Sequence, residues 1–125
     1  MSMESLQAGD LKIDIVDADA AIRLHWLGMS NERQPEKILK PFFATVLDGA
    51  GKSNKAIELH FENIERFNSS TILCIIQLIQ EARHKNIRLE VVYDPSRKWQ
   101  RLSFDALRIF DKADGLFALR PTGAA

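Results

Sequence analysis

The stretch FNSSTILCIIQLI, residues 67–79, decides how the rest of the chain is arranged. It joins an alternating, strand-like run at residues 56–61 to a helix-like run at residues 71–83. Small hydroxyl side chains therefore lie at a helix N-terminus, where the first backbone N–H groups lack intrahelical partners and the helix dipole is positive. Such a position favours an oxyanion, whether it belongs to a ligand, a carboxylate or a phosphorylated serine.

Composition limits the partners and surroundings of this chain. Its 125 residues suffice for one domain with its own core. Seventeen basic and seventeen acidic side chains cancel, so we expect no general attraction to nucleic acid or to an anionic membrane. The sequence has no apolar run long enough to span a membrane and no signal peptide, and its single cysteine, Cys74, excludes an internal disulfide. These features predict a cytoplasmic protein.

Upstream of the turn, apolar residues alternate twice and then recur at helical spacing. Residues 11–15 and 22–26 each place every second side chain on one face, which predicts two strands joined as a hairpin. Pro35 suits the first turn of the helix that follows. Pro41 is expected to kink or restart this helix, and the glycines within residues 49–51 are expected to end it.

Downstream of the turn, the pattern continues as helix, strand and helix. The basic segment 84–86 ends the central helix, with Asn86 suited to a left-handed cap, and residues 87–93 alternate as a strand. Residues 94–96 begin a last helix, and residues 116–119 are expected to add a short edge strand. The last helix carries apolar residues at spacings of three or four: Trp99, Leu102, Ala106 and Ile109.

The element order is β-β-α-β-α-β-α, which predicts an α/β fold with a mixed sheet of four or five strands. The two β-α-β passages require parallel strands with right-handed crossovers. Polar residues occupy every second strand position, so we expect the helices mainly on one face of the sheet. Residues 10–120 should form a single domain, with a loose N-terminus at 1–9 and a disordered tail at 121–125.

The region from residue 56 to residue 110 resembles the STAS domain of bacterial anti-sigma factor antagonists. In that family, a strand leads into an Asp-Ser-Ser/Thr-Gly turn, followed by a helix, a strand and a final helix that often begins near a proline. Residues 67–72 match the turn, and the strand at 87–93 and the helix after Pro95 match in order and spacing. The resemblance implies a STAS-like fold for this chain.

The resemblance also implies a partner switch. In that family, a kinase that is also the anti-sigma factor phosphorylates the hydroxyl residue after the Asp, which abolishes binding, and a phosphatase restores it. The matching residue here is Ser69, with Ser70 as the second candidate if the alignment shifts by one position. We expect a non-enzymatic signalling protein without a cofactor, whose partner-binding residues are Asn68, Ser69, Ser70, Thr71, Gln77, Gln80 and Glu81.

Two residues depart from the family pattern. Asn68 replaces the Asp, and Thr71 replaces the Gly. The Asn form is also similar to STAS-like proteins that regulate diguanylate cyclases. The alternative function is therefore a regulator of a diguanylate cyclase, or a scaffold subunit of a sensory complex. From the residues alone, Ser69 is also explained as a simple N-cap, which contributes about 1 kcal/mol to helix stability.

Other candidate sites carry weaker signals. His25 and His60 are expected on the solvated face of the sheet, near each other and Glu58, but no Cys/His ligand spacing predicts a metal site. The segment 49–53 lacks the first glycine of a phosphate-binding loop, so an enzyme is not expected. The basic segment 97–101 is interpreted as the polar face of the last helix, with Trp99 on the sheet edge, and Cys74 as inert core.

Overall fold

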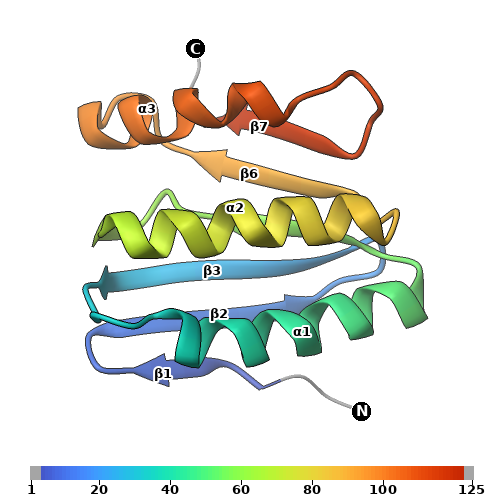
Figure 1. Ribbon diagram of the computed structural model, residues 1–125, viewed down its shortest axis with the longest axis horizontal. Coiled ribbons are helices and arrows are strands. Elements are labelled where there is room, and N and C mark those ends of the chain that lie inside the picture. The colour runs from blue at the N-terminus through green and yellow to red at the C-terminus, as the bar shows by residue number, and fades with distance from the viewer. Residues whose placement is uncertain (1–3, 123–125) are drawn as a thin grey trace.

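Seven strands and three α-helices make up the part of the chain that the computed structural model describes, residues 4–122 (Figure 1). The strands are β1 (Leu6–Ala8), β2 (Leu11–Asp17), β3 (Ala21–Ser30), β4 (Ala56–His60), β5 (Ile64–Phe67), β6 (Leu89–Tyr93) and β7 (Phe117–Pro121). The helices are α1 (Glu36–Ser53), α2 (Ser69–His84) and α3 (Lys98–Asp105), and α3 continues into the 3₁₀ helix η1 (Ala106–Phe110).

All seven strands belong to one mixed sheet. Its order is β1-β2-β3-β4-β6-β7, with β5 paired to the end of β3 beyond β4. The strands β1, β2 and β3 are antiparallel neighbours, whereas β3, β4, β6 and β7 are parallel. Helices α1, α2 and α3 lie in the connections between parallel strands, as the predicted β-α-β passages require.

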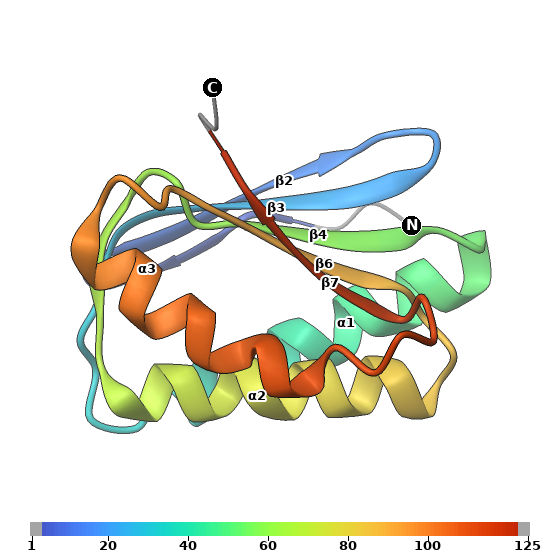
Figure 2. The ribbon, with the colours of Figure 1, turned by 90° about the horizontal axis from the view of Figure 1, so that it is seen from above.

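The helices lie on one face of the sheet, and the opposite face is open (Figure 2). Alternation along the strands explains this arrangement. In β3, Leu24 and Trp26 point into the core and are fully buried, whereas Arg23 points outward and is exposed. The predicted α/β class and the placement of the helices on one face are confirmed.

The sheet contains more strands than the four or five predicted. Residues 1–9 were expected to be loose, but Leu6–Ala8 form β1 and pair with β2. The strand β5 was not predicted, because Ile-Glu-Arg-Phe shows no alternation. The edge strand expected at 116–119 is present as β7, which extends to Pro121 within the expected tail. Thr122, also within the expected tail, donates to the Tyr93 carbonyl from its backbone N–H (2.8 Å) and from its hydroxyl (3.0 Å), and residues 123–125 lie outside the described residues.

Helix boundaries also differ from expectation. Helix α1 runs through Pro41 and the glycines at 49 and 51, and it ends at Ser53, where Asn54 takes the left-handed conformation (φ 54°). Asparagine tolerates this conformation, so the glycines are not needed as a stop signal. Asn86 takes the left-handed conformation after α2 as predicted, with φ 60°.

The last helix differs from expectation in its start and in its buried face. Helix α3 begins at Lys98 rather than at residues 94–96, and it buries Gln100 and Phe104. Leu102 and Ile109, which were predicted on its apolar face, are exposed to solvent.

The three helices all begin at the same end of the sheet. In Figure 1, β3 and β6 end at the left, and α1, α2 and α3 all begin there. The carboxyl ends of the parallel strands lie at this end of the sheet, which is where open α/β sheets commonly place their ligand sites. The turn before α2 lies at the same end, next to the loop that leads from β3 into α1.

Candidate functional site

Asn68, and not Ser69, is the N-cap of α2. Its backbone is extended, and its side-chain Oδ1 accepts hydrogen bonds from the backbone N–H of Thr71 (2.9 Å) and from the Thr71 hydroxyl (2.8 Å). The other end of the amide, Nδ2, donates to the Glu32 carbonyl at 2.8 Å. The interpretation of Ser69 as a simple N-cap is therefore wrong. The cap is an amide side chain that uses both of its ends: its oxygen accepts from Thr71 and its nitrogen donates to Glu32.

The structure explains why asparagine stands where the family pattern has an aspartate. A carboxylate at position 68 would accept the Thr71 hydrogen bonds equally well, but it has no proton to donate to the Glu32 carbonyl. Two oxygens would then face each other across a contact of 2.8 Å. Asn68 thereby ties the start of α2 to the loop between β3 and α1.

Thr71 supports the turn from below. Its side chain is fully buried, and its Oγ1 lies 2.7 Å from the Oγ of Ser30, which is 2% exposed. Because the Thr71 hydroxyl donates to Asn68, the Ser30 hydroxyl must be the donor in this pair. Thr71 was expected to contact a partner, but burial assigns it to the interior. It is the third helical residue, so the glycine of the family pattern is not required there.

Ser69 and Ser70 occupy the first two positions of α2. Ser69 is exposed and Ser70 is half-buried. No hydrogen bond joins either hydroxyl to another residue in the described range 4–122. Their backbone N–H groups belong to the first helical turn, which lacks intrahelical partners, and that turn carries no acidic residue. The surface at Ser69 thus combines a free hydroxyl with the positive end of the helix dipole.

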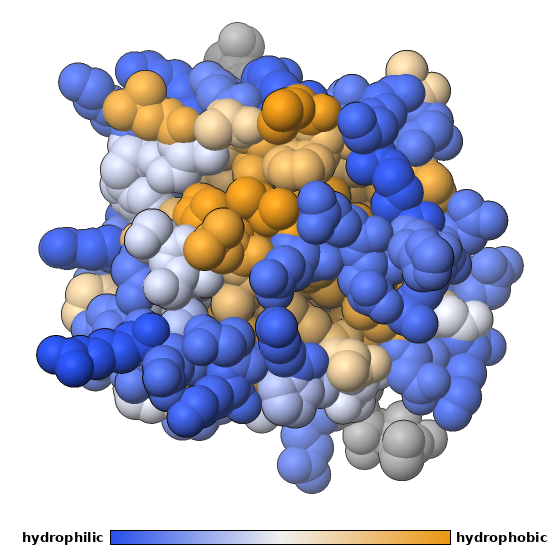
Figure 3. Space-filling model, in the orientation of Figure 1, coloured by the Kyte–Doolittle hydropathy of each residue, from blue (hydrophilic) through white to orange (hydrophobic). Residues whose placement is uncertain are grey.

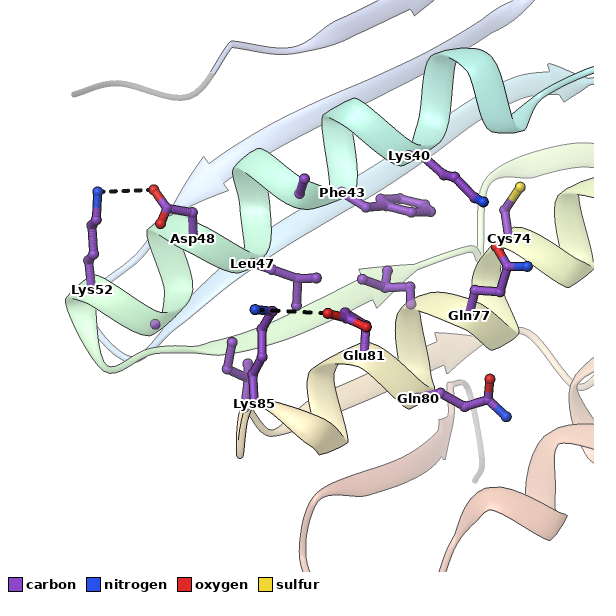
Figure 4. A pocket seen from close by; sticks show the side chains of 14 residues that line it. Lys40, Phe43, Leu47, Asp48, Lys52, Cys74, Gln77, Gln80, Glu81 and Lys85 are labelled. Carbon is purple, nitrogen blue, oxygen red and sulfur yellow. Dashed lines mark ion pairs between the residues drawn. The ribbon is translucent and has the colours of Figure 1, made fainter.

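The other expected contact residues, Gln77, Gln80 and Glu81, line a groove between α1 and α2 (Figure 4). The groove has a volume of about 880 Å³, and its floor includes Phe43 and Leu47. Two ion pairs lie at the rim of this groove, one between Lys52 and Asp48 (3.1 Å) and one between Lys85 and Glu81 (3.8 Å).

Cys74 lines the same groove and is 4% exposed, which agrees with its interpretation as core. Burial, with a smaller contribution from the charge of Glu36, raises the pKa of the Cys74 thiol. The neutral thiol is therefore favoured over the reactive thiolate.

Two side chains of the segment 97–101, which was interpreted as the polar face of the last helix, instead fix the approach to the turn. Gln100 is fully buried, and its side chain donates to the Phe61 carbonyl (2.7 Å) and accepts from the Asp94 N–H (2.8 Å). Arg97 donates to the carbonyls of Glu62 (3.0 Å) and Ile64 (2.9 Å). These bonds satisfy backbone carbonyls in the β4–β5 connection and at the first residue of β5, and they hold this segment against the start of α3. A polar residue in a helix gives no sequence signal for this role.

The open face of the sheet brings His25 and His60 together, as predicted. Their rings stack with centroids 4.5 Å apart, and His60 lies within 2.9 Å of Glu58 and 3.3 Å of Glu62. Burial, followed by the charge of His60, lowers the pKa of His25. Within residues 4–122, no group of three or more His, Cys, Asp or Glu side chains is arranged to hold a metal ion.

Comparisons with known proteins agree with this fold. No family model matches the sequence, and no curated protein matches it. One similar solved structure is the crystal structure of an anti-sigma factor antagonist from Mycobacterium paratuberculosis. It has a TM-score of 0.66 and 15% sequence identity, and the match covers 94% of this chain and 92% of that chain.

The described helices include none that is long and apolar enough to cross a membrane. A likeness at 15% identity concerns the fold, and its coverage of 94% of this chain extends beyond residues 56–110, where the sequence resemblance lies. The chain therefore has a STAS-like fold, which it shares with the solved structure of an anti-sigma factor antagonist.

Proposed function

We propose that this chain is a non-enzymatic protein-binding module that works as a phosphorylation-controlled partner switch. The unphosphorylated form binds a regulatory kinase that is also an anti-sigma factor, and a phosphatase reverses the modification. The observation that supports this proposal is that the residues of the turn have different structural roles. Asn68 caps the helix and Thr71 anchors it, which leaves the exposed Ser69 hydroxyl without a structural task.

The physics of the switch follows from the position of Ser69. A phosphoryl group there would bring nearly two negative charges to a surface that is neutral in its first helical turn. The helix N-terminus would hold the phosphate, because unpaired N–H groups and the dipole both favour an anion. A partner packed closely on Ser69, Gln77 and Gln80 would then lose affinity through repulsion and desolvation.

A second candidate function keeps the same surface but changes the partner. The asparagine at position 68 is the form that resembles STAS-like regulators of diguanylate cyclases, and the hydrogen bond from Nδ2 to Glu32 gives that asparagine a structural reason. In this case the chain would regulate a cyclase or serve as a subunit of a sensory complex, with Ser69 again exposed at the docking surface.

Intact-protein mass spectrometry with phosphopeptide mapping, on protein purified from its own cells, tests the modification. Phosphate on Ser69 supports the switch, and phosphate on Ser70 shifts the site by one residue. Protein that stays unmodified under several growth conditions would argue against phosphoregulation.

Affinity measurements with the captured partner then test the consequence. Ser69→Ala should bind like the wild type, and Ser69→Asp should bind at least about tenfold more weakly. Ser53→Asp, at the exposed last residue of α1, controls for added charge elsewhere. The switch is refuted if Ser69→Ala and Ser69→Asp bind alike. Recovery of a cyclase and of no sigma-pathway protein would favour the second function.

A further inference from the structure

Large apolar side chains are exposed together on the helical face of the molecule. Leu73 on α2 is 58% exposed, Leu102 on α3 is 62% exposed, and Ile109 on η1 is 71% exposed. Figure 3 shows hydrophobic surface gathered over α2 and over α3–η1 on this face. With the partly buried Ile76 and Trp99, these residues form what we call the α2–α3 apolar band. Exposed apolar surface gathered over two neighbouring elements is typical of an interaction site.

Contacts at both ends keep α3–η1 alongside α2. At the start of α2, the ring of Phe67 packs edge-on against Trp99, with centroids 5.2 Å apart. At its end, Arg83 donates to the Phe110 carbonyl at 2.7 Å and pairs with Asp114. The apolar band therefore spans two elements that are fixed relative to each other, and it begins beside the turn that carries Ser69.

The charges around the band are mainly positive. Residues 97–112 contain five basic residues and two acidic ones, which gives a local net charge of +3 (5 − 2) in a chain whose total is zero. Arg108 is paired with Asp105, and the Arg97 guanidinium lies over the Trp99 ring and donates to backbone carbonyls. Lys98 and Arg101 are exposed and form no ion pair with any residue in the range 4–122.

We propose that the α2–α3 apolar band binds an acidic amphipathic helix of a protein partner. An apolar stripe on that helix would cover Leu73, Leu102 and Ile109, and its carboxylates would meet Lys98 and Arg101. The inference rests on the proposed function only for the existence of a protein partner. It adds the chemistry of that partner and a second element, α3–η1, to its contact surface.

The acidic character of the partner also gives the switch a direction. Ser69 lies four residues before Leu73, so both occupy the same outward stripe of α2. A phosphate on Ser69 would stand at the end of the band and repel the carboxylates of the docked helix. Loss of binding on phosphorylation would follow without a conformational change in the fold.

Selection from a random-peptide library displayed on phage, with the full-length chain as target, tests the partner chemistry. Enriched peptides should combine apolar residues at helical spacing with an excess of Asp and Glu. They should bind Leu102→Ser/Ile109→Ser at least about tenfold more weakly than the wild type. Val16→Ser removes a 45% exposed apolar residue from β2, outside the band, and should leave binding unchanged. All three substituted residues are exposed, so these variants should fold.

Charge is tested with the same peptides. Lys98→Glu/Arg101→Glu should weaken binding at least about threefold, and raised salt should weaken wild-type binding in the same direction. The proposal is overturned by peptides without an acidic excess, or by peptides that bind the Leu102→Ser/Ile109→Ser variant as well as the wild type. It is also overturned if sedimentation shows a dimer that this variant abolishes, or if a labelled oligonucleotide occupies the band.

The same measurements separate this inference from the proposed function. Acidic peptides that bind the wild type and Ser69→Asp equally would refute the switch and leave the docking surface in place. Partner binding that depends on Ser69, together with full binding by Leu102→Ser/Ile109→Ser, would refute the docking surface and leave the switch in place.

Discussion

Asn68 is the residue on which the geometry of the turn depends. Asn68→Ala removes the cap for Thr71 and the bond to Glu32, and we expect it to lower the free energy of unfolding by about 1–2 kcal/mol. Asn68→Asp keeps the cap but loses the bond from Nδ2, so its cost should be smaller. Ser69→Ala should change stability by less than about 0.5 kcal/mol. Urea denaturation of the three variants checks this order, and a cost for Ser69→Ala as large as that for Asn68→Ala would contradict it.

The buried hydroxyl pair of Ser30 and Thr71 lies beneath the turn, and its contribution to stability can be tested by a double-mutant cycle. Thr71→Val keeps the shape of the side chain but leaves the Ser30 hydroxyl buried without its partner, at a cost of about 1–3 kcal/mol. Adding Ser30→Ala removes the orphaned hydroxyl, so the double variant should be more stable than Thr71→Val alone. Denaturant midpoints of the single and double variants measure the coupling. Additive losses would show that the pair does not act as a unit.

At the scale of elements, β3 depends on one glycine. Gly28 has φ +81°, and it immediately precedes a register shift within the pairing of β3 with β5. A Cβ at Gly28 would lie 2.0 Å from the Asp10 carbonyl oxygen, whereas a Cβ at Gly115 (φ +75°) would meet nothing within 4 Å.

Both glycine substitutions carry the strain of positive φ, about 1 kcal/mol, but only Gly28→Ala adds a backbone clash. We expect Gly28→Ala to destabilise the protein by more than about 2 kcal/mol and Gly115→Ala by about 1 kcal/mol. Thermal unfolding of the two variants under identical conditions makes the comparison. Equal losses would mean that the β1–β2 turn, which contains Asp10, relaxes to accept the methyl group.

The elements also show what the sequence can and cannot predict. Alternation placed β2, β3, β4 and β6, because charged or polar side chains alternate with the buried apolar ones along these strands. The strand β5 gave no such signal, because its two apolar residues, Ile64 and Phe67, are separated by two exposed charged residues and do not alternate. In α3, apolar spacing pointed to Leu102, whereas the buried side includes Gln100, whose hydrogen bonds compensate for its polarity.

The candidate site was predicted in position but not in detail. The turn at residues 67–71 was located because a strand pattern meets a helix pattern there. The choice between Asn68 and Ser69 as cap depends on where the helix begins, and sequence patterns leave this uncertain by a residue or more. The contributions of Ser30 and Glu32 come from the end of β3 and from the loop after it, more than thirty residues away in sequence, so no local pattern contains them.

At the scale of the whole molecule, stability should depend on pH through the open sheet face. Burial and the neighbouring His60 lower the pKa of His25 below its ordinary value of 6.5. The unfolded chain therefore binds this proton more readily than the folded protein, and the contribution of His25 to stability is present above pH 6.5 and is lost as the pH falls through the lowered pKa. His25→Gln removes this titrating group. The difference in unfolding free energy between pH 7.5 and pH 5.5 should be smaller in the variant, and an unchanged difference would exclude His25 as a source.

Glu58, like His25, makes the folded protein less stable as the pH falls, but in a more acidic range. Burial alone would raise its pKa, but hydrogen bonds from His60 and Arg23 outweigh burial and hold it below its ordinary value of 4.5. This contribution is present above pH 4.5 and is lost as the carboxylate becomes protonated in more acidic solution. No helix covers the open face of the sheet. It is stabilised by the hydrogen bonds of the Glu58 carboxylate with His60 and Arg23, and it loses this stabilisation when Glu58 becomes protonated.

The placement of the two tryptophans has an optical consequence. Trp26 is buried in the core, whereas Trp99 packs on Phe67 and belongs to the α2–α3 apolar band of the proposed docking surface. Their indole emissions should differ, with Trp26 blue-shifted and shielded from a soluble quencher and Trp99 accessible to it. Trp26→Phe would leave Trp99 as a native reporter, so that quenching by iodide could follow the arrival of a partner without any attached dye.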